Sequence, residues 1–120
     1  MKSCWFLISL LILAACSSAS PPQSAFQEEA RAFCRVHSID YWKNTNQLDE
    51  LNALGPTEKQ IRLTEEIRST ITSEEMKRVI YEDAQALNAE EFYPYLQHEL
   101  PKLTGEPFEC PAIEAFYIAP

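Results

Sequence analysis

The side chains best able to carry out chemistry in this sequence belong to four cysteines and two histidines. A zinc site needs three or four ligands held close together, whereas His37 and Asp40 could supply two at most and no CxxC pair is present. His37 falls on a helical stripe of apolar residues, so we expect it to be partly buried and hydrogen bonded. His98 lies between polar neighbours, on a helix face that we expect to be exposed. We therefore expect neither a metal site nor a catalytic histidine.

Catalytic motifs are the next signal to look for. The sequence contains no GxSxG, HExxH, SxxK or GxxxxGK[ST] pattern. Pairs of adjacent acidic residues could suggest a two-carboxylate hydrolase, but neighbours on a helix point about 100° apart. Three of the four pairs fall in expected first helical turns, where negative charge complements the helix dipole. We interpret them as structural and expect no enzyme; the pairs are Glu28-Glu29, Glu65-Glu66, Glu74-Glu75 and Glu90-Glu91.

The first fifteen residues have the plan of a secretory signal peptide. Lys2 supplies a positive charge, a nearly continuous apolar run extends from Trp5 to Leu13, and two small residues precede Cys16. A membrane-spanning helix needs about 20 apolar residues, and this run is shorter. We expect residues 1–15 to be removed on export.

The cleavage region Leu13-Ala14-Ala15-Cys16 resembles the lipobox of bacterial lipoproteins. The resemblance covers residues 1–16 and implies that Cys16 becomes the first mature residue and carries covalent diacylglycerol and acyl chains. Ser17, rather than an aspartate, implies the periplasmic face of the outer membrane. Residues 16–23 are small, polar and contain Pro, as expected of a tether. The alternative is an ordinary signal peptide that happens to have a cysteine beside its cleavage site.

Removal of the leader changes the cysteine count. Cys4 leaves with the signal and Cys16 is used by the lipid, so Cys34 and Cys110 remain. In an oxidising periplasm two remaining thiols in one small domain most simply pair with each other. A redox or metal-binding pair is the weaker alternative.

The mature chain has the pattern of an all-α protein. Sustained alternation of apolar and polar residues is absent, and capping-box patterns recur at helix-length intervals. We predict one domain over residues 24–120, a small bundle of five to six short helices joined by the disulfide. Expected caps are Ser24 with Gln27, Thr57 with Gln60, Thr72 with Glu75, and Asn88 with Glu91.

Glycine and proline mark the expected helix boundaries. We expect a short helix with Leu48 and Leu51 to end at Gly55-Pro56, with Gly55 left-handed. Ile61 should lie on a core stripe with Ile67 and Ile71. Pro94 and Pro101 predict a short or kinked helix over about 89–100, and Pro111 suits a first helical position. The other expected core positions are Phe26, Ala30, Phe33, Met76, Val79, Ile80, Ala84, Leu87, Phe92, Leu96, Leu103 and Ile113.

Charge excludes some partners. The chain has 10 Lys+Arg and 18 Asp+Glu, a net charge of −8, and loss of Lys2 with the leader makes the mature protein more acidic. Nucleic acids and anionic lipid headgroups both require basic surfaces. We expect no nucleic acid partner, and we expect the membrane to be reached only through the lipid on Cys16.

Four aromatic residues at expected helix ends suggest a partner-binding groove: Tyr41, Trp42, Tyr93 and Tyr95. Trp and Tyr are favoured where one side of a ring is apolar and the other is wet, as at protein interfaces. We predict a non-enzymatic lipoprotein that binds another envelope protein, with no cofactor and no metal. In architecture it is similar to the pilotin type of secretion lipoprotein, although no pilotin motif matches. The alternative is an inhibitor or immunity lipoprotein that neutralises a basic periplasmic toxin or hydrolase.

Overall fold

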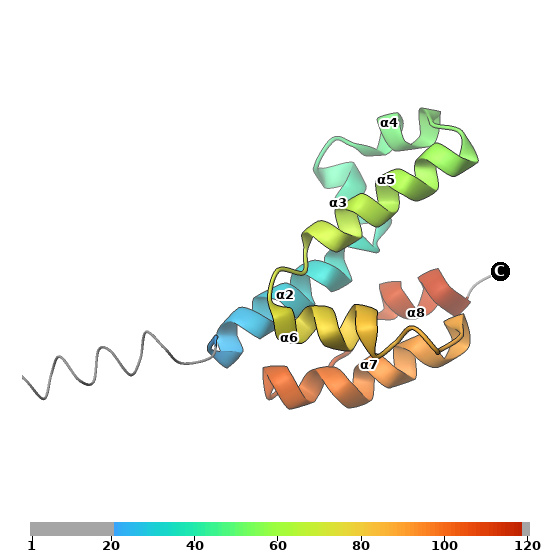
Figure 1. The fold of residues 1–120 in the computed structure, drawn as a ribbon. Coiled ribbons are helices and arrows are strands. Elements are labelled where there is room, and N and C mark those ends of the chain that lie inside the picture. The colour runs from blue at the N-terminus through green and yellow to red at the C-terminus, as the bar shows by residue number, and fades with distance from the viewer. Residues whose placement is uncertain (1–20, 119–120) are drawn as a thin grey trace, which may run out of the picture.

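The computed structural model describes residues 21–118, and that part of the chain folds into seven α-helices and one π-helical segment without strands (Figure 1). The predicted fold class, a small all-α bundle with one disulfide, is confirmed. The predicted signal peptide, Cys16 and most of the tether lie outside the described residues. The elements are α2 (Gln23–Val36), α3 (Ile39–Asn44), α4 (Leu48–Ala53), α5 (Pro56–Ser69), α6 (Glu74–Lys77), η1 (Arg78–Glu82), α7 (Ala89–Thr104) and α8 (Pro111–Ile118).

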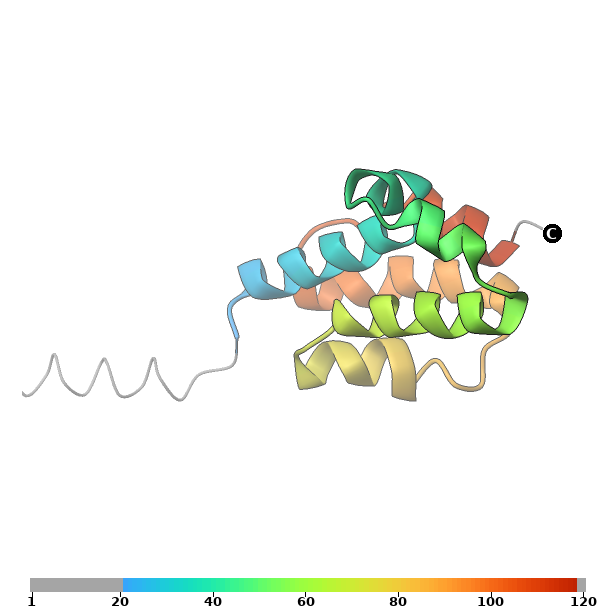
Figure 2. The ribbon, with the colours of Figure 1, turned by 90° about the horizontal axis from the view of Figure 1, so that it is seen from above.

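Helix α2 is the centre of the bundle, because it contacts α3, α5, α7 and α8. Figure 1 shows it passing between the group α3 to α5 and the group α6 to α8, and in the view of Figure 2 α3 and α4 lie on one side of it and α5 and α6 on the other. Apolar residues spaced three or four apart give α2 one buried face, made of Phe26, Ala30, Phe33 and Val36. The predicted core side of this helix is confirmed.

The disulfide is confirmed between Cys34 on α2 and Cys110, with the two Cα atoms 5.8 Å apart. A hydrogen bond also holds Cys110 against α7, because the Cys110 backbone N–H donates to the Tyr93 hydroxyl over 2.8 Å. Pro111 then begins α8 as predicted. The bond and the hydrogen bond together fix the chain before α8 against α2 and α7.

Three of the four predicted capping boxes are wrong. Helix α2 begins one residue early, with Pro22 at its N-cap, and α5 begins at Pro56, so Ser24 and Thr57 lie inside first turns. Helix α6 is capped by Ser73 rather than Thr72. Only the Asn88 box is confirmed, with both reciprocal hydrogen bonds present.

Gly55 is not left-handed but extended (φ −66°), and it serves as the N-cap of α5. Pro56 therefore starts a helix instead of preventing one, which its fixed φ and missing N–H allow at a first position. The left-handed residues of the described chain are Asn46 (φ 59°) and Gly105 (φ 73°). Gly105 ends α7, and a Cβ there would also meet the Gln23 side chain.

The predicted end of this helix near Leu100 is wrong, because α7 continues through both prolines to Thr104. Pro94 cannot donate to the Glu90 carbonyl, but both residues are exposed, so water can reach the freed carbonyl. The opposite face buries four side chains, which offsets the lost backbone hydrogen bonds. They are Tyr93, Leu96, Leu100 and Thr104.

The expected core positions between Met76 and Leu87 do not lie on one continuous α-helix, because this stretch forms α6, the π-helical segment η1 and a loop. Met76 and Ile80 are buried as predicted. In the π-helical segment the Asp83 N–H donates to the Arg78 carbonyl, and the Tyr95 hydroxyl donates to the Val79 carbonyl over 2.6 Å.

The stripe predicted for α5 is also partly wrong. Ile67 and Ile71 are buried, but Ile61 is 55% exposed. Leu63 packs against the core instead. The buried face of α5 is therefore rotated relative to the predicted one.

Glu29 joins α2 to the start of α6. Its Oε1 accepts hydrogen bonds from the Thr72 N–H (2.6 Å), the Thr72 hydroxyl (2.9 Å) and the Ser73 N–H (2.7 Å). Partial burial alone would raise the pKa of Glu29, but these hydrogen bonds outweigh burial and lower it. The carboxylate is thus stabilised in its charged form only when the protein is folded.

Replacing Glu29 should make the free energy of unfolding less dependent on pH in the acidic range. A carboxyl group with a lowered pKa in the folded state stabilises the fold above its unfolded pKa, near 4.5, and that contribution disappears as the pH falls through the lower folded value. Glu29→Gln should therefore lose about 1 kcal/mol of unfolding free energy at pH 7 and much less at pH 3. Urea unfolding at both pH values measures this. Glu65→Gln, an exposed control, should change stability by less than about 0.5 kcal/mol at either pH.

Candidate functional site

Two clefts follow one another along the line where α2 and its continuation meet the C-terminal segment. We call this line the α2 seam; residues 30–40 form one side and residues 104–116 the other. The Cys34–Cys110 disulfide crosses the seam between the two clefts. The walls of the seam are about 70 residues apart in sequence and are held together covalently.

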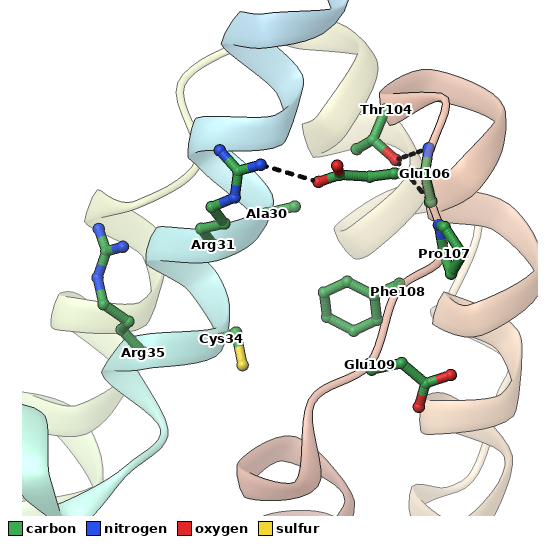
Figure 3. A pocket seen from close by; sticks show the side chains of 9 residues that line it. All are labelled: Ala30, Arg31, Cys34, Arg35, Thr104, Glu106, Pro107, Phe108 and Glu109. Carbon is green, nitrogen blue, oxygen red and sulfur yellow. Dashed lines mark hydrogen bonds and ion pairs between the residues drawn. The ribbon is translucent and has the colours of Figure 1, made fainter.

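The first cleft lies between α2 and the chain that follows α7, and has a volume of about 370 Å³ (Figure 3). Apolar atoms of Ala30, Pro107 and Phe108 contribute to its lining. On the α2 side, Arg31 is paired with Glu28 (3.3 Å) and with Glu106 across the cleft (3.2 Å). The lining residues are Ala30, Arg31, Cys34, Arg35, Thr104, Glu106, Pro107, Phe108 and Glu109.

Arg35 lies one helical turn after Arg31 on α2 and differs from Arg31 in its contacts. Within residues 21–118 it forms no ion pair and no side-chain hydrogen bond, and it is exposed. Its positive charge at the first cleft is therefore available to an anionic group from outside.

The second cleft has a volume of about 380 Å³ and lies where the α2–α3 junction meets α8. Ile39 and Phe116 on its walls are 70% and 37% exposed, respectively. The third large apolar side chain exposed in residues 21–118, Ile61, stands apart on α5. The lining residues are His37, Ser38, Ile39, Asp40, Ala112, Ala115 and Phe116.

His37 takes the packing role predicted for it. The ring is buried, and Nδ1 lies 2.7 Å from the Phe33 carbonyl. Because a carbonyl can only accept, Nδ1 carries the proton, and Nε2 can accept from the Tyr117 hydroxyl at 3.5 Å. Burial lowers the pKa of His37, against a smaller opposing effect of the Phe33 hydrogen bond. The side chain therefore stays neutral at pH 7 and keeps this end of the second cleft uncharged.

The four aromatic residues predicted to form one binding groove do not offer their rings to a partner together. Trp42 and Tyr93 are only 3% and 4% exposed. The Trp42 indole N–H donates to the Val36 carbonyl (3.0 Å), which α2 leaves unpaired at its end. Tyr93 holds Cys110, and Tyr95 bonds to Val79. This part of the site prediction is wrong, because tertiary packing buries Trp42 and Tyr93.

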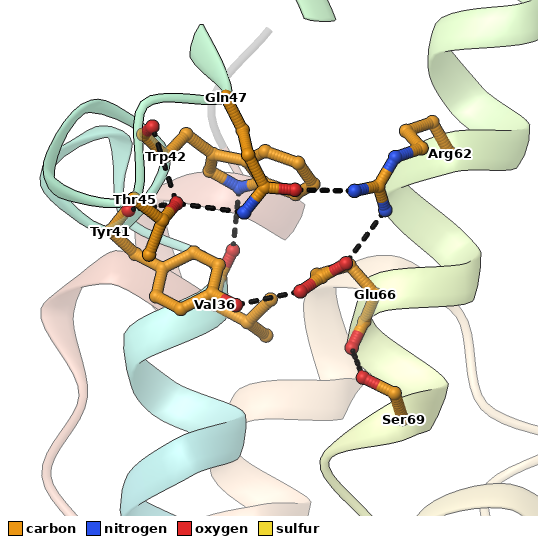
Figure 4. Close-up of polar contacts among 8 residues, drawn as sticks. All are labelled: Val36, Tyr41, Trp42, Thr45, Gln47, Arg62, Glu66 and Ser69. Carbon is orange, nitrogen blue, oxygen red and sulfur yellow. Dashed lines mark hydrogen bonds and ion pairs between the residues drawn. The ribbon is translucent and has the colours of Figure 1, made fainter.

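Tyr41 belongs to a polar network between α3 and α5 (Figure 4). Its hydroxyl donates to Glu66 over 2.6 Å, and Arg62 donates to the same carboxylate (2.6 Å) and to Gln47. The hydrogen bonds from Tyr41 and Arg62 lower the pKa of Glu66, and the bond to Glu66 raises the pKa of Tyr41. Arg62 also lies 5.3 Å from the Trp42 ring centroid. The side chains satisfy one another, so the network positions α3 and leaves no reactive group free.

Residues 21–118 contain no cluster of three or more Cys, His, Asp or Glu side chains that could hold a metal ion. Among the same residues, none of the helices combines the length and apolar character needed to cross a bilayer. His98 is exposed beside Glu99, as predicted.

Sequence reasoning missed the α2 seam itself. Helical spacing does not mark Arg35, Ile39 and Phe116 as parts of one surface, because tertiary packing brings them together. A signal was present in Pro107 and Pro111, which bracket a short non-helical stretch that had to run along the surface. Comparison with other proteins adds no assignment, because no family model, characterised protein or solved structure matches the chain.

Proposed function

We propose that this protein is a lipoprotein, anchored through Cys16 to the periplasmic face of a bacterial outer membrane, whose helical body binds another envelope protein. The anchor rests on the lipobox Leu13-Ala14-Ala15-Cys16. The binding role rests on one observation above all: two of the three large apolar side chains exposed in residues 21–118 flank the same cleft. Single exposed apolar residues are ordinary, whereas neighbouring ones mark interaction surfaces. We propose no enzymatic activity, cofactor or metal.

The position of the second cleft supports this role. Helix α2 starts at Gln23, a few residues after the proposed anchor, and rises about 1.5 Å per residue. Its 14 residues therefore separate the cleft from the start of the helix by about 20 Å. A partner at Ile39 and Phe116 would meet the end of α2 farther from the tether.

Site-specific photo-crosslinking in intact cells tests the proposal. A benzoylphenylalanine at position 39 or 116 should capture the same envelope protein, identified by mass spectrometry, and Ile39→Asp should reduce capture from position 116 at least fivefold. The matched control is position 61, which is exposed and apolar on α5. Equal capture from position 61, or none from positions 39 and 116, would contradict binding at this cleft.

The same experiment separates the two candidate roles. An inhibitor or immunity protein should capture a basic toxin or hydrolase, which the excess of acidic residues would attract. Mass spectrometry of the purified protein tests the anchor independently. Acyl chains on the residue at position 16, absent from Cys16→Ala, are the expected result.

A further inference from the structure

The two cysteines of the disulfide differ in their access to solvent. Cys110 is 0% exposed and lines neither cleft of the α2 seam. Cys34 is only partly buried and lines the first cleft, and Figure 3 shows its sulfur pointing from α2 toward the C-terminal wall of that cleft. A reagent that enters the first cleft therefore meets the Cys34 end of the bond and not the Cys110 end.

The first cleft has the size and the charge balance to admit a thiol. Its volume of about 370 Å³ falls in the range of small-ligand pockets, about 300–1,000 Å³. Arg31 and Arg35 on α2 face Glu106 and Glu109 on the opposite wall, so the charges of the lining cancel. Repulsion from the other acidic groups of the protein is screened beyond about 8 Å at physiological salt. The lining therefore does not exclude the thiolate, which is the form that attacks disulfides.

The chain around Cys110 is held in place by contacts that do not involve its sulfur. The Cys110 N–H donates to the buried Tyr93 hydroxyl over 2.8 Å. Phe108, two residues earlier, is buried in the core, and Pro111 begins α8 directly after Cys110. Because these contacts remain when the S–S bond is broken, the Cys110 thiol stays beside Cys34 and can close the bond again.

We infer that Cys34 is the site at which this disulfide exchanges with an external thiol, and that Cys110 is the resolving cysteine. The external thiolate enters the first cleft and forms a bond to Cys34 Sγ. The Cys34–Cys110 bond breaks, and its electron pair leaves on Cys110 Sγ, which then takes up a proton. The Cys110 thiolate can return to Cys34 Sγ and expel the external thiolate, or a second external thiol can complete the reduction and leave as the disulfide of the external pair.

Oxidation of the reduced chain follows the same route in reverse. The Cys34 thiolate attacks an external disulfide and releases one of its two thiols, and Cys110 then displaces the other and closes the bond. The co-substrate is a thiol–disulfide couple, either a small molecule such as glutathione or the dithiol of an oxidoreductase. Because the bond fastens the walls of the α2 seam, the first cleft controls whether they are joined. This inference goes beyond the proposed function and does not depend on the partner at the second cleft.

Peptide mapping of the oxidised wild-type chain tests the assignment. The protein is mixed with reduced glutathione, and the reaction is stopped early with excess N-ethylmaleimide. Mass spectrometry should find glutathione on Cys34 with maleimide on Cys110, at least tenfold in excess of the reverse arrangement. An equal mixture, or an excess of glutathione on Cys110, would overturn the assignment.

Single-cysteine variants test whether access is the cause. In the folded state the Cys34 thiol of Cys110→Ala should react with an aromatic disulfide reagent at least tenfold faster than the Cys110 thiol of Cys34→Ala, with peptide mapping to identify the modified position. In concentrated urea the two rates should agree within about twofold, because unfolding exposes both thiols. Equal rates in the folded state, or the same difference in urea, would contradict control by the cleft. Circular dichroism verifies that each variant is folded, and if one is not, the wild-type mapping decides.

Experiments in cells distinguish the two sources of the thiol. Exchange in Cys110→Ala stops at the mixed disulfide on Cys34, because the resolving thiol is absent. Non-reducing electrophoresis and mass spectrometry should then show on Cys34 either a glutathione adduct or a bound oxidoreductase, which identifies the co-substrate. Cys34→Ala is the matched control and should carry at least fivefold less adduct at Cys110. Equal yields on the two variants, or no adduct on Cys34, would overturn the inference, whereas the crosslinking from positions 39 and 116 tests the proposed function separately.

Discussion

Removal of both disulfide cysteines, as Cys34→Ala with Cys110→Ala, should lower the free energy of unfolding by about 4 kcal/mol. The bond closes a loop of 76 residues, so it greatly restricts the unfolded chain while leaving the folded chain almost unchanged. A domain of this size has a total stability of roughly 5–15 kcal/mol. The double variant should therefore unfold at a far lower urea concentration than the wild-type protein.

Two controls make this measurement specific. Wild-type protein treated with a reductant lacks the bond but keeps both cysteine side chains. If the effect comes from the bond itself, this protein should lose about as much stability as the double variant. Cys16→Ala should leave the urea midpoint of the helical body unchanged. Equal midpoints for the double variant and the oxidised wild type would show that the bond contributes no stability.

Leu96→Ala should cost about 3 kcal/mol, the second large effect. Leu96 is fully buried on α7, the helix that packs against α2, α8 and η1. Truncation removes apolar contacts and leaves a cavity that close-packed neighbours fill only in part. Urea unfolding with an unchanged slope against denaturant concentration is the expected signature.

The control for Leu96 lies on the same helix. His98→Ala alters an exposed residue two positions away and should change stability by less than about 0.5 kcal/mol. A cost below about 1 kcal/mol for Leu96→Ala would contradict the described packing of α7.

Local sequence patterns were reliable where the structure is itself local. The Asn88–Glu91 box was predicted correctly because each partner is reached within one helical turn. Ser24 and Thr57 match the same pattern but do not cap, because Pro22 and Pro56 set the helix starts. The disulfide was predictable because Cys34 and Cys110 are the two cysteines outside the predicted signal peptide and lipobox.

Features that depend on distant contacts were not predictable from spacing. Thr72 forms a hydrogen bond to Glu29, which lies 43 residues away in the sequence, and Ser73 caps α6 instead. The α2 seam likewise forms between residues that are far apart in the chain. The aromatic prediction failed for the same reason, since Trp42 at the end of a helix turned out to be covered by tertiary packing.

The covalent closure of the seam has a consequence for timing. Arg35 and Ile39 stand on one wall, Pro107–Glu109 and Phe116 on the other, and the Cys34–Cys110 bond fastens the two walls. In a reducing cytoplasm the walls would lack that fastening, and oxidation after export would supply it. Under the proposed function, the docking surface would therefore mature only after export, which would protect the newly made chain from premature association.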